Sequence, residues 1–453
     1  MTDSATSSPT PSTPKGPTLA TQLRHTAACV LAVEQGRSLS EVLPEVPQTL
    51  RPGVQALTFH VLRQLGTARA LVGLLAQRKP APPVQALLSC AVALLLDSGN
   101  EQAPRYPAHT VVSQAVEAAR QDRHTERQAP FVNACLRRFL RERADLLADV
   151  EADLVARWNH PLWWIERLQR DHPDHWAAIL EANNQPGPMA LRVNRRRVDR
   201  STYQQALQAM GLASQPVGND GLVLASPQPV DRLPGFADGH CSVQDGAAQM
   251  AAELLLEGRA WTTTDRVLDA CAAPGGKTAH LLERADLHVL AIDIDPRRCE
   301  RIEDTLRRLG LHAEVRSADA AKPAGWWDGQ AFDAILLDAP CTASGIVRRH
   351  PDVRWLRRAS DVDALVTTQR ALLEAMWPLL KPGGRLLYAT CSVFRAEGAD
   401  QVQAFLVHHS DARHRPSPGH LLPGLAAPLR QFNDNPSGGY DGFFYARIDK
   451  AQP

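Results

Sequence analysis

The residues best suited to chemistry are two cysteines and one aspartate in the C-terminal half of the chain. Asp338 and Cys341 belong to the string Asp-Ala-Pro-Cys, and Cys391 belongs to Ala-Thr-Cys-Ser, each following a short apolar run. If these runs are neighbouring parallel strands, their carboxyl ends meet at one edge of a sheet and bring the two thiols together. A single free cysteine is usually a packing residue, but two thiols and a carboxyl group at one edge indicate a reaction site.

This set of groups suits methyl transfer to carbon 5 of a pyrimidine, which is a poor nucleophile in the free base. A thiolate that adds to carbon 6 converts the ring into an enamine and makes carbon 5 nucleophilic. A carboxyl group hydrogen-bonded to N3 stabilises the charge that builds there, and a base must then remove the carbon-5 proton before the thiol leaves. The sequence supplies one group for each step, and either Cys341 or Cys391 could be the attacking thiol.

A third string, Asp-Ala-Cys-Ala-Ala-Pro-Gly-Gly-Lys-Thr at 269–278, follows an apolar run and precedes a predicted helix. Its glycines allow a ligand close to the backbone, but it has neither the Gly-x-Gly-x-x-Gly spacing of dinucleotide sites nor a P-loop spacing. The pattern therefore favours a nucleoside cofactor without a pyrophosphate, and S-adenosylmethionine fits. The expected cofactor-binding residues of this turn are Cys271, Ala272, Ala273, Pro274, Gly275, Gly276 and Lys277.

Aspartates end four successive predicted strands, at Asp269, Asp293, Asp319 and Asp338. One aspartate after a strand is usually a turn residue or a helix cap. Four in consecutive units predict a line of carboxylates across the carboxyl edge of the sheet, which suits ribose hydroxyls, an adenine amine and a cationic centre. We expect Asp293, Asp319 and Asp338 to take part in binding the cofactor.

The elements that must position these residues form an alternating pattern. The predicted strands are 267–270, 289–294, 313–317, 332–337, 385–390 and 443–448, with helices at 296–309 and 361–380 between them. This order indicates an α/β fold with a mainly parallel, doubly wound sheet. Helical spacing dominates earlier in the chain, including one long amphipathic helix from Phe131 to Leu147. The predicted divisions are a disordered tail (1–16), a helical domain (17–150), a small α+β domain (151–235) with predicted strands at 189–193 and 221–224, and the α/β domain (236–453).

Composition sets outer limits on the class of protein. The 453 residues include 50 basic and 49 acidic side chains, a net charge of +1, which excludes a uniformly basic protein that coats nucleic acid. Residues 17–150 hold 15 basic and 11 acidic side chains, so a local excess of +4 lies in the helical part. None of the eight cysteines forms a Cys-x-x-Cys pair, and we see no secretory leader and no apolar run long enough for a membrane. We expect a cytoplasmic protein with free thiols, no metal site, no membrane contact and no obligate protein partner.

The three strings together resemble the RNA 5-methylcytosine methyltransferase family, and within it the bacterial group that acts on small-subunit ribosomal RNA. The resemblance covers about residues 18–450. It extends to Ser242-Val-Gln-Asp245, Asp441-Gly-Phe-Phe-Tyr445, Arg192-Val-Asn194 and Arg348-Arg-His-Pro-Asp352, while Phe131-Val-Asn-Ala-Cys-Leu-Arg-Arg138 resembles the helical NusB RNA-binding domain. It implies a Rossmann-like methyltransferase domain preceded by an all-α NusB-like domain and a small RRM-like α+β domain.

The resemblance also implies roles for single residues. Cys391 would be the nucleophile, Cys341 would act as the base for product release, and Asp338 would contact N3 of the target base and lie near the cofactor. The cofactor would be S-adenosylmethionine, held by 271–277 with Asp293 and Asp319. The substrate would be a flipped or unpaired cytosine of structured 16S ribosomal RNA, of the position-967 type. One departure is Thr342-Ala-Ser-Gly345 after Cys341, where the family usually has Ser-Gly/Ala-Thr-Gly.

Basic clusters are candidate phosphate contacts, although each alone is more often a solvated face. The expected RNA-contacting residues are Arg137, Arg138, Arg192, Arg348 and Arg349. Three alternatives stay open at this point. The same reaction could act on tRNA, the chain could be a non-catalytic NusB-like RNA-binding factor, or it could be a nicotinamide-dependent oxidoreductase, which the missing glycine spacing opposes.

Overall fold

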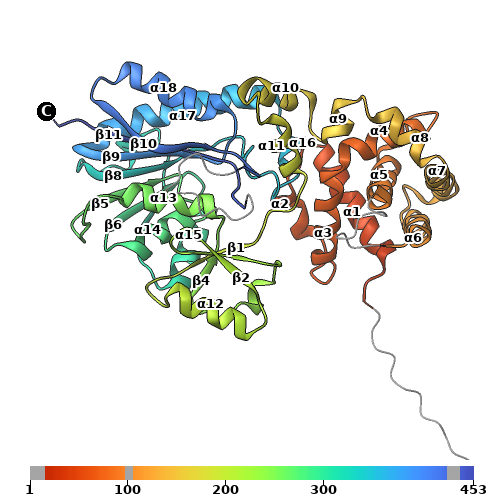
Figure 1. Ribbon diagram of the computed structural model, residues 1–453, viewed down its shortest axis with the longest axis horizontal. Coiled ribbons are helices and arrows are strands. Elements are labelled where there is room, and N and C mark those ends of the chain that lie inside the picture. Colours follow the sequence, from red (N-terminus) through yellow and green to blue (C-terminus); the bar gives the residue numbers. More distant parts are fainter. Residues whose placement is uncertain (1–15, 97–105, 426–438, 453) are drawn as a thin grey trace, which may run out of the picture. The chain divides into compact units, whose positions relative to one another are not determined.

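A computed structural model describes residues 16–96, 106–425 and 439–452 (Figure 1). The chain divides into two compact units, with the division between Leu162 and Trp163. The predicted tail, apart from Gly16, lies outside the described residues. None of the described helices combines the length and the apolar character needed to cross a membrane.

The first unit is helical in all its described elements. The central helix α5 is almost uniformly apolar, with every residue from Ala86 to Leu95 buried, and the other helices pack around it. Its helices are α1 (Leu19–Glu34), α2 (Leu39–Val42), α3 (Arg51–Arg63), α4 (Leu65–Leu75), α5 (Pro82–Leu96), α6 (Ala108–Arg120), α7 (Ala129–Arg141), α8 (Arg143–Val150) and α9 (Leu154–Trp158).

The expected single helix from Phe131 to Leu147 is wrong, because the helix ends at Arg141 and a second begins at Arg143. At the break, the Arg143 guanidinium donates to the carbonyl oxygens of Leu95 (3.1 Å) and Leu96 (2.9 Å) at the end of α5. The last carbonyl groups of a helix lie beyond the reach of its regular hydrogen bonds, and these two bonds stabilise that end of α5. The periodic apolar pattern continues through the break, so it could not reveal the turn.

Helix α9 belongs to the first unit, although it lies beyond the domain boundary predicted at residue 150. The Thr67 N–H donates to Asn159 Oδ1 (3.0 Å), and Thr67 Oγ1 donates to the carbonyl oxygen of Ala156 (2.6 Å). The predicted domains 151–235 and 236–453 fall largely within the second compact unit, because side chains of the smaller sheet reach into the larger domain. Three separate domains with those boundaries therefore stay a prediction.

A small antiparallel sheet opens the second unit, in the strand order β2-β3-β1-β4. The sequence predicted β1 and β3, but it missed β2 and β4, which are only four and three residues long. The strands are β1 (Ala190–Val193), β2 (Ser214–Val217), β3 (Gly221–Leu224) and β4 (Cys241–Val243), and the helices are α10 (Leu162–Asp171), α11 (Trp176–Asn183) and α12 (Arg200–Ala209).

The large sheet has seven strands in the order β10-β11-β9-β8-β5-β6-β7. Strands β5 to β9 are parallel, and β11 and β10 add an antiparallel edge. This confirms the mainly parallel sheet, with the strands before both reactive strings side by side. The strands are β5 (Arg266–Ala270), β6 (His288–Asp293), β7 (Glu314–Ser317), β8 (Phe332–Asp338), β9 (Leu380–Thr390), β10 (Ala412–Leu421) and β11 (Phe443–Lys450).

Helices cover both faces of this sheet (Figure 1). On one face Val267, Ala279 and Ile302 belong to one apolar core, and on the other face Ile335 and Leu373 belong to another. The first core includes residues of α13 (Gly246–Leu256), α14 (Gly276–Arg284) and α15 (Pro296–Leu309), and the second includes residues of α17 (Ala359–Met376) and α18 (Ala399–His408); α16 (Val353–Leu356) is a single turn. The bounds of α15 match the prediction.

Arg192 ties the small sheet to the large domain. Its side chain is fully buried, and its guanidinium donates to both carboxylate oxygens of Glu283 (2.7 and 2.8 Å) and to the carbonyl oxygen of Gly276 (2.6 Å). A fourth bond reaches Gln244 Oε1 (2.5 Å). The expectation that Arg192 contacts RNA phosphate is therefore wrong, because this guanidinium has no exposed surface and its hydrogens are used inside the protein.

We predict that Arg192→Met lowers the free energy of unfolding by about 3–5 kcal/mol, because it leaves the Glu283 carboxylate buried without its partner. Urea-induced unfolding measures this. The matched control is Arg196→Met in the turn that follows β1, which removes a partly exposed ion pair with Asp286 (2.7 Å) and is expected to cost about 1 kcal/mol or less. Equal stability of the two variants, with RNA affinity lost only in Arg192→Met, would contradict the internal role of Arg192.

Candidate active site

A pocket of about 500 Å³ lies at the carboxyl edge of the parallel strands. It contains both cysteines of the reactive strings together with residues of the glycine-containing turn, so the structure brings the predicted groups together. The predicted residues that line it are Cys271, Ala273, Pro274, Lys277, Asp293, Asp319, Asp338, Cys341 and Cys391. Among the predicted cofactor residues, Ala272, Gly275 and Gly276 do not line the pocket and instead shape the turn beneath it.

The turn at 271–276 is tight because several backbone positions are special. Cys271 has a φ of 63° and Gly275 a φ of 90°, both in the left-handed region that favours glycine. A Cβ at Gly275 would also lie 3.1 Å from Ile302 of α15. These features bring Ala273 and Pro274 to the pocket wall and start α14 at Gly276, so that Lys277 in its first turn points to the same space.

Asp269 does not belong to the pocket, so the expected line of four carboxylates has three members. Its side chain is fully buried, and Oδ2 accepts a hydrogen bond from Thr278 Oγ1 (2.5 Å). Burial raises the pKa of Asp269 to about 7. The alternation of a strand explains the error, because the last residues of β5 point alternately to opposite faces and only the following turn faces the pocket.

The two carboxylates expected at the cofactor have different surroundings. Asp293 is buried, and its oxygens accept hydrogen bonds from the backbone N–H groups of Ala273 and Asp295, both at 3.2 Å. Asp319 is more exposed, and a hydrogen bond from Lys322 (3.0 Å) lowers its pKa. Asp293 is thus a fixed carboxylate at the end of β6, where α/β folds place the ribose of a nucleoside.

The residues present fit S-adenosylmethionine. Asp293 offers a carboxylate for ribose hydroxyls, the turn allows close approach of a ligand, and the walls between them are apolar. Further residues line the pocket without having been predicted as site residues: Ile292, Ile294, Arg298, Ala318, Ala320, Ala321, Ala339, Pro340, Ile346, Thr368, Leu372 and Phe443. Ala339 and Pro340 lie in the Asp-Ala-Pro-Cys string and Phe443 lies in Asp441–Tyr445, whereas the others come from segments without a recognisable motif.

Lys277 and Asp338 form an ion pair inside the pocket, with Nζ 2.7 Å from Oδ2. Burial alone would lower the pKa of Lys277, but the charge of Asp338 and its hydrogen bond raise it overall, so the lysine stays an ammonium ion. Its Nζ also lies 5.3 Å from the centre of the Phe443 ring. The pair fixes the direction of the Asp338 carboxylate and places the Lys277 ammonium in the same pocket as the thiols.

The sulfur atoms of Cys341 and Cys391 lie 3.3 Å apart, and both residues are partly exposed. The hydrogen bond to Cys391, together with burial, raises the pKa of Cys341 well above its usual range. At neutral pH Cys341 therefore keeps its proton and can donate it toward the sulfur of Cys391. Burial also raises the pKa of Cys271 to about 12, so this third thiol of the pocket is a poor nucleophile.

Two further arginines that were expected to contact RNA form ion pairs within the protein. Arg348 is 5% exposed and pairs with Asp441 (Nε to Oδ1, 3.1 Å), and Arg349 pairs with Asp441 and with Asp245 (2.7 Å). These pairs join three strings noted in the sequence. The expectation of a phosphate contact at Arg348 is therefore wrong, because its guanidinium is buried against Asp441. Arg349 is partly exposed, so its contact with RNA stays a prediction.

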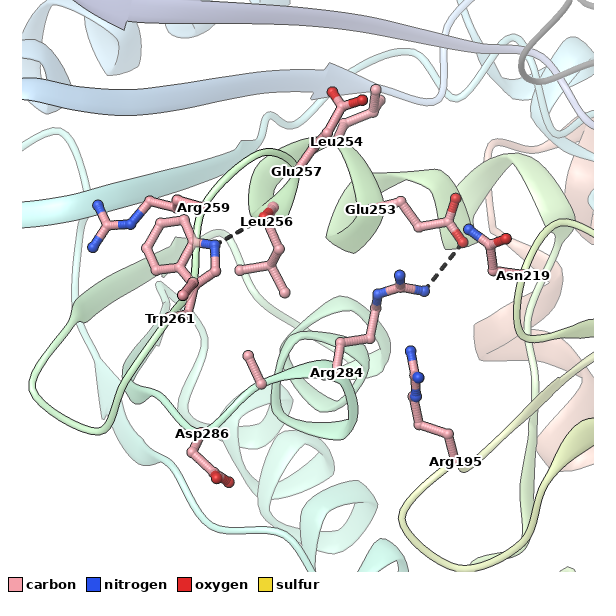
Figure 2. A pocket seen from close by; sticks show the side chains of 12 residues that line it. Arg195, Asn219, Glu253, Leu254, Leu256, Glu257, Arg259, Trp261, Arg284 and Asp286 are labelled. Carbon is pink, nitrogen blue, oxygen red and sulfur yellow. Dashed lines mark hydrogen bonds and ion pairs between the residues drawn. The ribbon is translucent and has the colours of Figure 1, made fainter.

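Another pocket, of about 660 Å³, lies at the far end of α14 from the glycine-containing turn (Figure 2). It contains no cysteine, and Arg284 in its wall pairs with Glu253 (3.2 Å) and with Asp220 (2.6 Å). Its charges are therefore largely neutralised, and it has no group for covalent catalysis. Within the described residues, no group of three or more histidine, cysteine, aspartate or glutamate side chains is arranged to hold a metal ion.

Comparison with known proteins identifies the family of this chain. Three family models match the chain: NusB family over residues 21–141, RsmF/B-like ferredoxin-like domain over 160–231, and 16S rRNA methyltransferase RsmB/F over 259–449. The ribosomal RNA small subunit methyltransferase B of Vibrio cholerae is 42% identical over 446 residues, which cover 94% of this chain and 97% of that protein. The chain belongs to the ribosomal RNA small subunit methyltransferase B family.

Solved structures agree with this fold. The crystal structure of PH0851 matches 94% of this chain and 99% of its own, with a TM-score of 0.71 and 25% identity. A methyltransferase homologue from Pyrococcus horikoshii matches 65% of this chain and 97% of its own, with a TM-score of 0.54 and 27% identity. Membership of the methyltransferase B family confirms the predicted resemblance, and with it the order of a NusB-like, a small α+β and a Rossmann-like methyltransferase domain.

We predict a pH-dependent contribution of Asp269 to stability. Because its pKa in the folded protein is about 7, above the unfolded value, the stability contributed by its protonated form is complete below about pH 4 and is lost as the pH rises through about 7. Asp269→Asn keeps an oxygen for Thr278 and cannot ionise. Unfolding free energies measured from pH 4 to 8 should therefore fall less with pH in Asp269→Asn than in the wild type. Parallel profiles, matching those of the exposed control Asp286→Asn, would contradict this.

Proposed function

We propose that this protein transfers a methyl group from S-adenosylmethionine to carbon 5 of a cytosine in 16S ribosomal RNA, through a covalent bond between Cys391 and carbon 6 of the base. The observation that carries the proposal is the pair of thiols 3.3 Å apart beside Asp338, in a pocket that fits the methyl donor. Membership of the methyltransferase B family supports ribosomal RNA as the substrate.

S-adenosylmethionine supplies an electrophilic methyl group when it is bound. The turn at 271–277 would line one side of its site, and Asp293 would accept hydrogen bonds from the ribose hydroxyls. Asp319 would be available to the adenine amine. Asp338 lines the pocket together with the thiols, so the target base would be presented to the methyl donor next to Cys391.

Cys391 is the nucleophile in this proposal. The raised pKa of Cys341 keeps a proton on that thiol, and its S–H group stabilises a thiolate on Cys391. The thiolate adds to carbon 6 of the cytosine, which makes carbon 5 nucleophilic. Asp338, fixed by Lys277, contacts N3, and the lysine ammonium offsets negative charge that builds on the ring.

Cys341 acts in the release of the product. Once Cys391 is a thioether it can no longer carry a negative charge, so it no longer helps to raise the pKa of Cys341 in that way. Cys341 then loses its proton to solvent more readily, and its thiolate accepts the proton from carbon 5. The electron pair returns to the ring and breaks the bond between carbon 6 and Cys391, which leaves methylated cytosine, a Cys391 thiolate and a protonated Cys341.

The target base must leave its stack to reach the thiols, and the helical unit offers a surface for the surrounding RNA. A groove of about 750 Å³ there has several basic and no acidic residues in its lining. Arg78 and Lys79 are exposed on its loop, and the half-buried Phe131 offers an aromatic surface. Arg138 also lines it, held by Glu142 (2.7 Å), whereas Arg137 is exposed on α7 outside the lining. We infer that this groove contacts RNA phosphates.

The alternatives differ in what they need from the chain. The same reaction on tRNA requires an identical pocket, so only the identity of the modified RNA separates the two substrates. A non-catalytic RNA-binding factor has no use for paired thiols and a cofactor pocket, and both are intact here. An oxidoreductase with a nicotinamide cofactor would require a pyrophosphate-binding turn that the chain lacks. Methylation of ribosomal RNA is thus the reading with the most support.

Complementation of a deletion strain tests the reaction. Wild type should restore the bisulfite-resistant cytosine in 16S ribosomal RNA and leave the tRNA signal unchanged. Cys391→Ala should restore no methylation and form no covalent RNA complex, because it removes the attacking sulfur. Cys341→Ala should accumulate a covalent protein–RNA complex, visible in denaturing gels, because the base for product release is missing. A complex formed by Cys391→Ala, or a signal restored only in tRNA, would contradict the proposal.

Replacement of the two exposed cations of the groove tests the RNA surface. Arg78→Ala combined with Lys79→Ala should weaken binding of a 16S ribosomal RNA fragment and reduce the slope of log affinity against log salt by about 1 for each lost phosphate contact. Binding of S-adenosylmethionine should not change. The control is Arg120→Ala, an exposed arginine at the end of α6 outside the groove. An unchanged salt slope in the double variant would rule out the groove as a phosphate-binding surface.

A further inference from the structure

Glu397 is a carboxylate without any exposed surface, placed just behind the two reactive cysteines. It ends the short helix η6 (Arg395–Glu397), which follows the Cys391 turn. No motif in the sequence marks Glu397, and an isolated glutamate is usually solvent-exposed. Its environment is the opposite, since both of its oxygens are saturated with hydrogen bonds from inside the protein.

The hydrogen bonds of Glu397 reach the residues that follow each cysteine. Oε1 accepts from the Thr342 N–H (2.8 Å), and Oε2 accepts from Thr342 Oγ1 (2.5 Å) and from Ser392 Oγ (2.6 Å). A fourth donor is Gln369 Nε2 (3.2 Å), which also bonds the carbonyl oxygen of Pro340 (2.9 Å), the residue before Cys341. One carboxylate therefore fixes the backbone beside both thiols.

The main chain of Glu397 adds to this arrangement on the side of Cys391. Its carbonyl oxygen accepts hydrogen bonds from Tyr388 OH (3.0 Å) and from Thr390 Oγ1 (3.3 Å), and Thr390 is the residue before Cys391. The loop after β8 is also bonded directly to the loop after β9, because the Gly345 N–H donates to the carbonyl oxygen of Cys391 (2.9 Å). The segments on both sides of each cysteine are thus held by one buried network.

We propose that Glu397 is a positioning residue that sets the distance between the sulfur atoms of Cys341 and Cys391. The importance of that distance for catalysis rests on the proposed function. A buried carboxylate is costly unless it is fully hydrogen-bonded, and replacing such a group by apolar residues often stabilises a protein. Its presence behind a reaction site therefore points to geometry rather than to stability. The negative charge of Glu397 also helps to raise the pKa of Cys341, after the larger effects of Cys391 and of burial.

The site requires a side chain whose two oxygens accept four hydrogen bonds. Glutamine in the same place keeps one carbonyl oxygen but replaces the other by an NH2 group, which cannot accept hydrogen bonds from Ser392 and Thr342. At least one loop would then move relative to the other. A displacement of about 1 Å at a reaction site can cost about a hundredfold in rate.

The experiment compares wild type with Glu397→Gln in a direct test of the thiol pair. Phenylarsine oxide is captured by two thiols held close together, and mass spectrometry of the intact protein measures the rate of capture, with Cys341→Ala as the background. We expect Glu397→Gln to slow capture at least about tenfold and to lower kcat about a hundredfold, with KM for S-adenosylmethionine within about twofold of wild type. Asp400→Asn, an exposed carboxylate three residues away, should behave as wild type.

Capture at the wild-type rate in Glu397→Gln would overturn the proposal, even if kcat fell. If Glu397→Gln slows capture but the wild-type protein methylates no RNA, the positioning role is supported and the proposed reaction is contradicted. Failure of the positioning role and failure of the proposed function are therefore distinguishable. If Glu397→Gln does not fold, as judged by binding of S-adenosylhomocysteine, Ser392→Ala removes the bond to Glu397 beside Cys391, together with the bonds of Ser392 Oγ to Ser344 Oγ (2.8 Å) and to the Phe394 N–H (3.0 Å). Intermediate capture by Ser392→Ala then supports the proposal, and wild-type capture contradicts it.

Discussion

Hydrogen bonding between the neighbouring parallel strands β8 and β9 is the constraint on which the site depends. Their register pairs Asp338 with Ala389, and the N–H of Ala339 continues the ladder by donating to the carbonyl oxygen of Ala389 (2.9 Å). Both strands therefore end at the same level of the sheet, and the turns after them carry one thiol each. A slip of one residue would turn every side chain of a strand to the other face and separate the two sulfur atoms.

Buried and half-buried charged groups then fix the turns that the sheet alone cannot hold. Arg192 braces the start of α14 through Gly276, Arg349 joins Asp245 to Asp441, and Glu397 fixes the segments around the thiols. Each charge is compensated by several hydrogen bonds, which is the condition for burying it. The near-zero net charge of the chain reflects this use of arginine and carboxylate inside the protein as well as on its surface.

Much of the catalytic domain was predictable because short apolar strands and helical periodicity are local signals. They located β5 to β9, β11 and α15, and the strings after the strands identified Asp338, Cys341 and Cys391. The sequence could not distinguish the buried Arg192 and Arg348 from exposed arginines, because burial depends on partners such as Glu283 and Asp441 that are distant in the chain. Strand β10 was not predicted, because its residues Arg413, His414, Arg415 and Pro416 are typical of a loop. An edge strand such as β10 tolerates them.

The central claim is that Cys391 attacks the target base while Cys341 stays free for product release. The most direct measurement uses a 16S ribosomal RNA fragment in which the target cytosine is replaced by 5-fluorocytosine, so that the step that removes the group on carbon 5 is blocked and the adduct persists. After incubation with S-adenosylmethionine and digestion, mass spectrometry identifies the peptide linked to the methylated nucleotide. The account predicts the bond at Cys391. A bond at Cys341, or no covalent adduct with a substrate that the enzyme methylates when unmodified, would contradict it.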